Sequence, residues 1–277
     1  MFFVNFSGGF GNQIIQFLFA IRLRACCGQR VAICVLDPKY TVVSKSIIEV
    51  ARKNKIRVIH CKQPFFSRRF RRITRLNRPR LGFISNFDEV DFNSLSSFMC
   101  QHLIFDGYWQ SPRNFLKLSQ MNFDWYADKK PVSDERLNGL CVIHFRLGDY
   151  QSLLNRIVFS PVRVDFFKRA IARISAKSPG IRFCVCSNGS RTQVELFCRD
   201  VGFDDGDVYR FDGDWLETFE LMTSASYLIG SNSTFSLMAF FLGREAKISA
   251  FFPLVWFRFG AHPLALVKKS LPNLNLI

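Results

Sequence analysis

The stretch Cys141-Val142-Ile143-His144-Phe145-Arg146-Leu147-Gly148-Asp149-Tyr150 joins an apolar run to a charged turn that contains glycine. This pattern predicts a buried strand that delivers polar groups at its end. Because side chains alternate along a strand, His144 and Arg146 should face one side of the sheet, as two cationic-capable groups. Ligands of open α/β sheets bind beyond the carboxyl ends of strands, where a guanidinium suits a phosphate or a carboxylate. Arg146 is the first candidate for an anion ligand; a structural ion pair with Asp149 is the alternative.

The composition excludes a disordered chain. Hydrophobic residues make up 48% of the sequence, and Phe alone contributes 32 of 277 residues, so a large core in one large or two moderate domains is expected. The formal net charge of +16 indicates a basic surface. Such a surface favours anionic partners, namely nucleotide-type substrates, membrane phospholipids or nucleic acids.

The cysteines are typical of a reducing compartment. Their number, nine, is odd, and most lie in apolar runs, as Cys34 and Cys141 do. Cys184-Val185-Cys186 lacks the spacing of metal ligands, and no run of about 18 apolar residues is present. Met1 leads directly into a predicted strand. We therefore expect a cytoplasmic protein with no metal site of cysteines.

A strand, a glycine loop and a helix are predicted at the start of the chain. Residues 2–7 read as a strand, Gly8-Gly9-Phe10-Gly11-Asn12-Gln13 as the loop, and residues 14–25 as the helix. Such a loop lets backbone N–H groups approach an anion at a helix N-terminus. The third glycine of a dinucleotide fingerprint is replaced by Ile14, so a tight structural turn explains the loop equally well. Strands at 31–36 and 57–61 and a helix at 46–53 then predict a parallel sheet.

Two further stretches in this half have open interpretations. The segment 65–80 holds seven arginines among apolar residues, which suits an anionic membrane surface or an ordinary solvated helix. Tyr108, Trp109 and Gln110 follow a strand near Ile104. These side chains could face a sugar, or the aromatic rings could pack in the core. A polar stretch at 128–135 marks the expected domain boundary.

The second half alternates strands and helices. Helices are predicted at 165–175, 192–201, 216–223 and 237–242, and strands at 182–186, 208–211 and, as the final buried strand, 227–230. The last strand leads into Ser231-Asn232-Ser233-Thr234-Phe235-Ser236. This polar turn caps a helix and offers a pocket for an oxyanion, whereas capping alone needs one such residue. Asp212-Gly213-Asp214 is either a metal-binding pair or an ordinary turn, and the turn is preferred.

Three stretches, residues 8–13, 144–150 and 231–236, resemble in order and spacing the alpha-1,2-fucosyltransferases of glycosyltransferase family 11, of bacterial type. The resemblance covers nearly the whole chain. It implies an α/β, GT-B-like fold of two Rossmann-type domains whose parallel sheets face a central cleft. Residues 1–130 would form the acceptor-side domain and residues 131–277 the GDP-sugar-binding domain. Whether the last helix packs back on the first domain stays open.

The resemblance also implies a reaction: the inverting transfer of L-fucose from GDP-β-L-fucose to the 2-hydroxyl of a terminal galactose. No metal or other cofactor is implied. The acceptor would be an O-antigen or other surface oligosaccharide, either free or lipid-linked. The protein would be cytoplasmic or peripheral on the inner face of the membrane. Arg146 would bind the donor diphosphate, with Asp149 and His144 as candidate general bases. The implied donor-binding residues are Gly9, Gly11, Asn12, Gln13, His144, Arg146, Ser187, Asn188, Ser231, Asn232, Ser233, Thr234 and Phe235, and the acceptor-binding candidates are Tyr108, Trp109 and Gln110.

The sequence departs from the family pattern at several positions. Leu147 stands where a second arginine is common, Thr218 where an acidic residue is common, and Ser187-Asn188-Gly189 where Ser-Asp-Asp is common. These departures keep open a glycan- or nucleotide-sugar-binding protein without catalysis. A nucleic-acid-binding protein is less favoured, because the arginines lie in no recognisable binding module.

Overall fold

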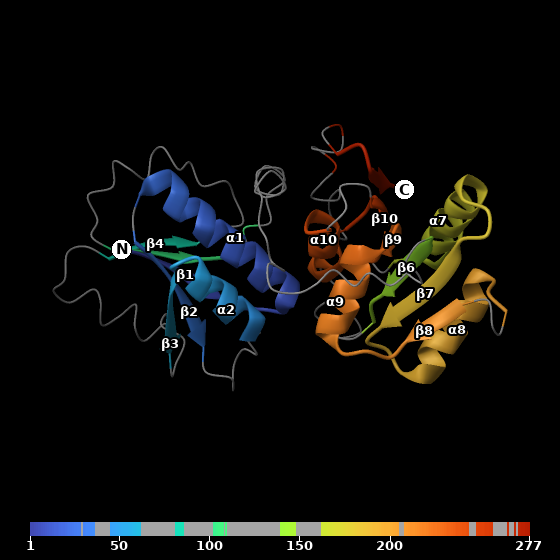
Figure 1. The fold of residues 1–277 in the computed structure, drawn as a ribbon, viewed down its shortest axis with the longest axis horizontal. Coiled ribbons are helices and arrows are strands. Elements are labelled where there is room, and N and C mark those ends of the chain that lie inside the picture. Colours follow the sequence, from blue (N-terminus) through green and yellow to red (C-terminus); the bar gives the residue numbers. More distant parts are fainter. Residues whose placement is uncertain are drawn as a thin grey trace. The chain divides into compact units, whose positions relative to one another are not determined.

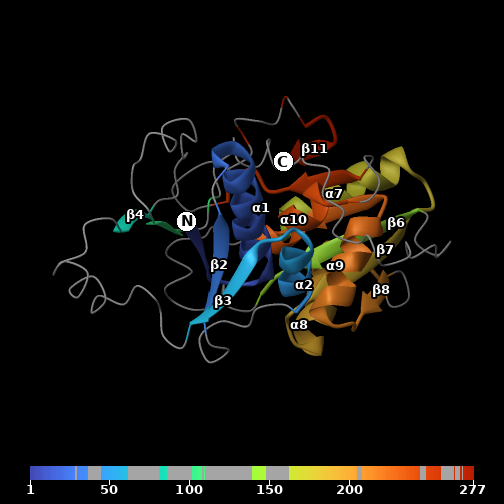
Figure 2. The same cartoon turned by 60° about the vertical axis from the view of Figure 1, so that its left-hand side comes forward.

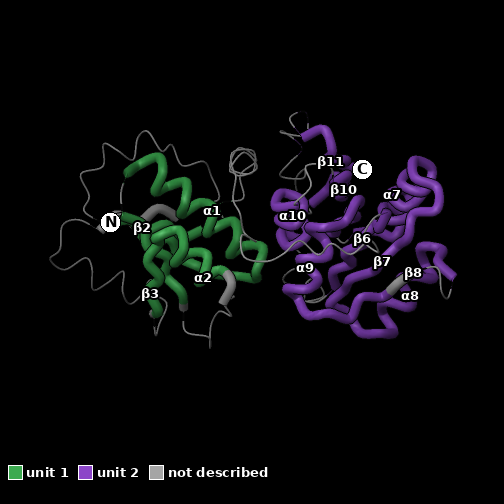
Figure 3. Tube along the Cα trace, viewed as in Figure 1, with its two compact units in different colours: residues 1–121 green, residues 122–277 purple. Residues whose placement is uncertain are grey.

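A computed structural model of the chain divides into two compact units, residues 1–121 and 122–277 (Figure 3). The sequence places the boundary at residue 130, and the roles assigned to the two domains stay predictions. The structure describes residues 1–28, 30–36, 45–61, 81–85, 102–107, 109, 139–147, 162–204, 208–243, 248–256, 265, 269 and 271–277.

Unit 1 is built on a five-stranded parallel sheet with the strand order β3-β2-β1-β5-β4 (Figure 1). Its strands are β1 (Phe2–Phe6), β2 (Val31–Leu36), β3 (Arg57–Cys61), β4 (Leu81–Ser85) and β5 (His102–Asp106), and its helices are α1 (Phe10–Cys27) and α2 (Lys45–Lys53). The crossovers from β1 to β2 and from β2 to β3 step in the same direction. Right-handed crossovers therefore place α1 and α2 on the same face of this sheet.

The core of unit 1 forms between α1 and the sheet. Apolar side chains on this helix are buried, among them Ile14, Phe17 and Phe19. The helix begins at Phe10 rather than at Ile14, because Gly9 is its N-cap and Gly8 makes the preceding turn with φ +74°. The glycine loop is thus shorter than the sequence suggests.

Unit 2 is built on a six-stranded parallel sheet with the order β11-β10-β9-β6-β7-β8. Its strands are β6 (Leu140–Phe145), β7 (Arg182–Ser187), β8 (Val208–Phe211), β9 (Tyr227–Gly230), β10 (Ser249–Phe252) and β11 (Leu274–Leu276). Its helices are α7 (Val164–Lys177), α8 (Arg191–Val201), α9 (Trp215–Ser224) and α10 (Thr234–Phe241).

The order of these strands reverses between β6 and β9. The chain steps outward from β6 to β7 and β8, then returns to the other side of β6 and continues through β9 to β10. Right-handed crossovers in opposite directions place α7 and α8 on one face and α9 and α10 on the other (Figures 1 and 2). In open α/β sheets, ligands bind beyond the carboxyl ends of the strands at such a switch point, which here is the end of β6 and β9.

The predicted α/β class with parallel sheets is confirmed. The prediction that residues 227–230 form the final strand is wrong, because β10 pairs with β9 and β11 pairs with β10. The helix expected at the end of the chain is not among the described elements, and the last of these is β11. Among the described residues, no helix is long and apolar enough to cross a membrane. The basic segment 65–80 lies outside the described residues.

Aromatic side chains fill the α7–α8 side of the unit 2 core. Phe145 stacks on Phe197 with ring centroids 3.9 Å apart, and Phe167 meets both rings edge-on. Cys141 and Cys184 are buried free thiols in the same unit, as the apolar runs around them predict. This packing fixes the end of β6, and therefore the position of the residues that follow it.

Candidate functional site

The ends of β6 and β9 are joined by hydrogen bonds at the topological switch point. His144 is the register partner of Gly230, and the Ser231 backbone N–H donates to the His144 carbonyl at 3.2 Å. The Arg146 backbone N–H donates to Ser231 Oγ, also at 3.2 Å. A Cβ at residue 230 would lie 2.2 Å from the Phe252 ring, so only glycine fits there without a shift. The turns after the two strands therefore form one unit.

The guanidinium of Arg146 lies at the N-terminus of α10. Its Nη1 is 3.4 Å from Ser233 Oγ, and the same oxygen accepts a hydrogen bond from the Phe235 N–H at 3.3 Å as the helix cap. The first turn of a helix carries N–H groups without intrahelical partners and a partial positive charge. A guanidinium beside such a terminus concentrates positive potential at one place. The arrangement therefore suits an anion.

His144 is a neutral member of this cluster. Its side chain is 6% exposed, and burial, together with the charge of Arg146, lowers its pKa from 6.5 to about 3. Its ring packs against Phe235 with centroids 5.6 Å apart, and its Nδ1 has no hydrogen-bond partner among the described residues. Of the two cationic-capable groups expected here, Arg146 is the cation and His144 is a neutral imidazole. A group with this pKa is also a weak general base near neutral pH.

Two predicted faces of β6 are confirmed. His144 and Arg146 contact residues of the α10 turn, whereas Phe145 packs with α7 and α8 on the opposite face. Leu147 follows Phe145 in this alternation and lies against the turn after β7. The polar side chains therefore gather on one side of the strand, as the period of two predicts.

The turn after β7 holds the turn after β6. Asn188 Oδ1 accepts a hydrogen bond from the Leu147 backbone N–H at 2.9 Å, and Ser187 Oγ accepts one from the Gly189 N–H at 3.0 Å. A Cβ at Gly189 would come within 2.6 Å of Leu147 Cδ1. Two departures from the family pattern, Leu147 and Gly189, are thus in direct contact, as an apolar side chain against a bare backbone.

The remaining residues of the serine-rich turn have mostly structural partners. Asn232 is 1% exposed and donates from Nδ2 to the Trp256 carbonyl at 3.1 Å. Ser236 Oγ donates to the Ser233 carbonyl at 3.1 Å. Thr234 and Phe235 are only half-buried at the start of α10. Some polar side chains of this turn, those of Asn232 and Ser236, therefore stabilise the fold, whereas Ser231 and Ser233 contact Arg146 in the candidate site.

The glycine loop of unit 1 is also held by amides. Gln13 is 1% exposed and donates from Nε2 to the Gly8 carbonyl at 2.9 Å. Gly9 is exposed, Gly11 is buried in the first turn of α1, and Asn12 is half-buried. Gln13 thus has a structural role in the loop, and donor binding by these four residues stays a prediction.

Gln16 was missed by sequence reasoning. It is fully buried on α1, accepts a hydrogen bond from the Ser7 N–H at 3.0 Å, and donates to the Gly107 carbonyl at 2.9 Å. Ser7 follows β1 and Gly107 follows β5, so one amide ties together the ends of two neighbouring strands. The signal available in the sequence was an amide inside the otherwise apolar run from Ile14 to Ala20.

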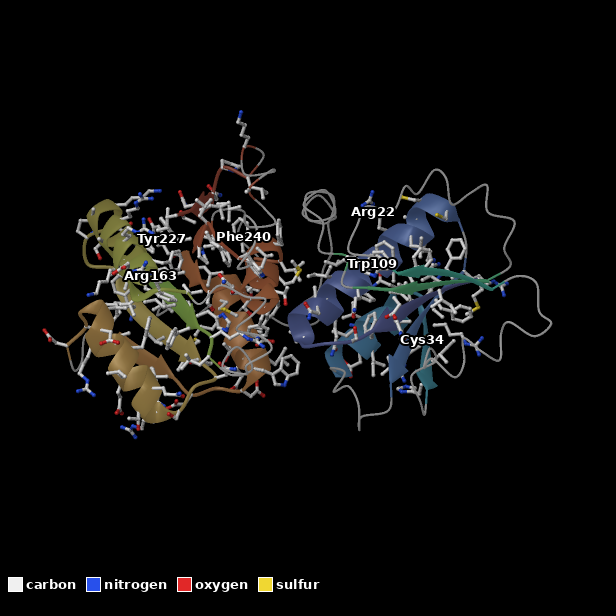
Figure 4. The ribbon with its side chains drawn as sticks, turned by 180° about the vertical axis from the view of Figure 1, so that it is seen from behind. Arg22, Cys34, Trp109, Arg163, Tyr227 and Phe240 are labelled. Atoms are coloured by element: carbon white, nitrogen blue, oxygen red, sulfur yellow. The ribbon has the colours of Figure 1, made fainter. Side chains whose placement is uncertain are left out.

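The acceptor-site candidates are only partly described. Trp109, which is labelled in Figure 4, is fully buried. Its ring is stacked on Phe19 with centroids 4.2 Å apart, and its backbone has φ +54°. This placement favours the packed-core interpretation over a sugar-stacking face. Tyr108 and Gln110 lie outside the described residues, as does Asp149.

The acidic pair near α9 has structural partners. Asp214 is the N-cap of α9, where its Oδ1 accepts from the Leu216 and Glu217 N–H groups at 2.8 Å. Asp212 forms an ion pair with Arg210 at 3.1 Å. Thr218, another departure from the family pattern, donates from Oγ1 to the Asp214 carbonyl at 2.7 Å. Within the described parts of the chain, no group of three or more potential metal ligands gathers.

Solved structures of two fucosyltransferases are similar to the chain. POFUT1 in complex with GDP shares 11% identity at a TM-score of 0.44, over 91% of this chain and 97% of that chain. NodZ alpha-1,6-fucosyltransferase soaked with GDP-fucose shares 16% identity at a TM-score of 0.46, over 87% and 91%. NodZ from Bradyrhizobium, in another structure, shares 14% identity at a TM-score of 0.42, over 86% and 91%.

Comparison of sequences gives a more direct assignment. No curated protein matches the sequence at a significant level. The family model described as glycosyl transferase family 11 matches residues 85–252, which is more than half of the chain. The matched range includes β6, the turn after it and the serine-rich turn before α10. The chain therefore belongs to glycosyl transferase family 11, the family of fucosyltransferases that its three motifs resemble.

Proposed function

We propose that this protein transfers L-fucose from GDP-β-L-fucose to the 2-hydroxyl of a terminal galactose, with inversion at the anomeric carbon and without a metal. Membership of the family supports the reaction class. The observation that carries the proposal is the Arg146 guanidinium beside Ser233 at the N-terminus of α10. A cation and a helix N-terminus at a topological switch point form a site for a nucleotide diphosphate.

The reaction develops negative charge on the leaving GDP. The bond between the anomeric carbon and the β-phosphate oxygen breaks, and its electron pair stays on that oxygen. The acceptor oxygen bonds to the opposite face of the anomeric carbon and gives up its proton to a base. Preorganised donors aimed at the developing charge lower the barrier. Arg146 and the N–H groups at the start of α10 would supply these donors in place of a metal.

The proton of the acceptor hydroxyl needs a base of suitable pKa. Of the two candidates, His144 has a pKa lowered to about 3 by burial and by the charge of Arg146. It would be a poor acceptor of a proton near neutral pH. We therefore favour Asp149 as the base and give His144 a positioning role next to the donor. The galactose would belong to an O-antigen or another surface oligosaccharide, with a lipid-linked acceptor included.

The first experiment measures GDP release from GDP-fucose with a panel of β-galactosides in the presence of EDTA. We expect release that depends on the acceptor, persists in EDTA and falls about 100-fold or more in Arg146→Ala. Arg173→Ala is the matched control, because Arg173 is an exposed arginine on α7. Its activity should equal that of the wild type.

Three results would contradict parts of the proposal. Release that stops in EDTA and returns with manganese would show a metal-dependent enzyme. A folded protein that binds GDP but releases none with any acceptor would indicate a binding protein without catalysis, an alternative that the Leu147–Gly189 contact keeps open. A folded protein that does not bind GDP would exclude the donor.

A further inference from the structure

Unit 1 contains a pocket far from its glycine loop. The pocket has a volume of about 400 Å³ and is lined by Arg24, Gly28, Arg30, Val31, Lys55 and Arg57, together with Met1. This volume lies within the usual range for small-molecule sites. We refer to it as the basic pocket.

The basic pocket lies at the amino-terminal edge of the sheet. Arg30 directly precedes β2, Arg57 begins β3, and Arg24 lies in the last turn of α1. The glycine loop and the Ser7–Gln16–Gly107 hydrogen bonds lie at the opposite edge, after β1 and β5. A strand rises about 3.3 Å per residue, so five-residue β1 separates the two edges by about 16 Å. Within unit 1, the basic pocket is therefore separate from the glycine loop.

The charged side chains that line the pocket are all basic. Arg24, Arg30, Lys55 and Arg57 form no ion pair with a carboxylate of any described residue. Two helices, α1 and α2, end at this edge, and each C-terminus carries about −0.5 elementary charge. These helix ends offset only about one of the four positive charges. About three positive charges remain uncompensated, and an interaction with the helix C-termini does not account for them.

The local backbone fixes two of these cations. The Arg24 Nη1 donates to the Asn54 carbonyl, which ties the end of α1 to the turn after α2. Lys55, the next residue, has φ +54°, a left-handed conformation in which glycine or asparagine is the usual residue. Lysine is therefore an unusual residue for this turn, and Lys55 is one of the residues that line the pocket.

We propose that the basic pocket binds a phosphate-bearing anion. Three exposed cations, Arg30, Lys55 and Arg57, would contact the phosphate oxygens, and Arg24 would contribute from the helix end. A pyrophosphate, free or at the end of a lipid, and the headgroup of an anionic phospholipid share this chemistry. The site does not depend on the proposed transfer reaction.

The test uses the full chain carrying Arg146→Ala, so that the proposed donor site does not bind the probe. Inorganic pyrophosphate is titrated by calorimetry into this protein and into a variant that also carries Arg30→Ser and Arg57→Ser. We expect binding to weaken about tenfold or more when both arginines are removed. The control carries Arg169→Ser and Arg173→Ser, two exposed arginines on α7, and loses the same charge. Its affinity should not change.

Vesicles distinguish the sources of the phosphate. The same variants are sedimented with vesicles of phosphatidylcholine alone and with vesicles that also contain phosphatidylglycerol. Retention on the second kind that is lost only in the pocket variant indicates a membrane headgroup. Pyrophosphate binding that depends on the pocket, with unchanged vesicle retention, indicates a soluble or lipid-linked diphosphate. The proposal is overturned if neither probe distinguishes the pocket variant from the control, provided that both variants keep the circular dichroism spectrum of the wild type.

Discussion

The chemistry of the candidate site depends on the different environments of two basic residues, His144 and Arg146. The side chain of His144 is buried, packed on Phe235 and neutral, whereas the guanidinium of half-buried Arg146 reaches the α10 turn. The positive charge of Arg146 is itself one cause of the low pKa of His144. An anion that neutralises this charge should therefore raise the pKa of His144.

Stability should fall in acid because of His144. Its pKa is lowered from 6.5 to about 3 in the folded protein, so below about pH 6.5 the unfolded chain binds more protons than the folded one. The stability is present above the unfolded pKa and is lost progressively as the pH falls toward the folded pKa. Between about pH 7 and pH 5 the loss should be about 2 kcal/mol.

Urea unfolding of the wild type and of His144→Gln at several pH values measures this loss. The glutamine cannot take up the proton, so its pH dependence over the same range should be smaller by that amount. Equal slopes for the two proteins would show that His144 does not carry the effect. His60, an exposed histidine on β3, provides the control variant His60→Gln, which should keep the slope of the wild type.

Leu147 and Gly189 should be energetically coupled. The Cβ that Gly189→Ala adds would lie only 2.6 Å from Leu147 Cδ1. The half-exposed leucine side chain would therefore have to rotate away. We expect a destabilisation of about 1 kcal/mol that Leu147→Ala relieves. A double-mutant cycle on the free energy of unfolding should give a coupling of about 0.5 to 1 kcal/mol. Additive effects would mean that the two side chains move independently.

Secondary-structure elements are joined at their ends by single polar side chains. Gln16 connects α1 to the residues after β1 and β5, Asn188 connects the turns after β7 and β6, and Ser231 connects those after β9 and β6. In each case the carboxyl ends of neighbouring strands are held together. Loops that carry function need such support from rigid elements.

Removing the Gln16 amide should therefore destabilise unit 1. Gln16→Leu leaves the Ser7 N–H and the Gly107 carbonyl without this partner, at a cost of about 1–3 kcal/mol for each group that remains buried. Urea unfolding followed by circular dichroism measures this cost. Gln13→Leu is the comparison, because its partner, the carbonyl of exposed Gly8, can bind water. If Gln16→Leu lowered the free energy of unfolding no more than Gln13→Leu does, the hydrogen bonds of Gln16 to Ser7 and Gly107 would not be important for stability.

The fold of both units follows largely from local patterns in the sequence. Short apolar strands alternate with amphipathic helices, and β8 and β9 have the bounds that the pattern predicts. The strand β10, Ser249–Phe252, was missed because a four-residue apolar run after a helix does not distinguish a strand from a buried turn. Long-range pairing, here with β9, decides such cases.

The candidate site was predictable only in part from the sequence. Arg146 and the serine-rich turn could be brought together from the sequence, because carboxyl ends of parallel strands meet at one edge. The neutrality of His144 and the burial of Trp109 could not, since both depend on which side chains surround them in three dimensions. The basic pocket was also not predictable, because its four cations come from two connections, α1–β2 and α2–β3, that are separated in the sequence.

The hydroxyl of Ser233 has a further chemical consequence. A serine oxygen has two lone pairs and one hydrogen. One lone pair accepts the Phe235 N–H and the other faces the Arg146 guanidinium. Both acceptor positions are thus occupied within the protein, and only the hydroxyl hydrogen is left for a further hydrogen bond. Ser233 can therefore form a further hydrogen bond only as a donor, which suits an acceptor such as a phosphate oxygen.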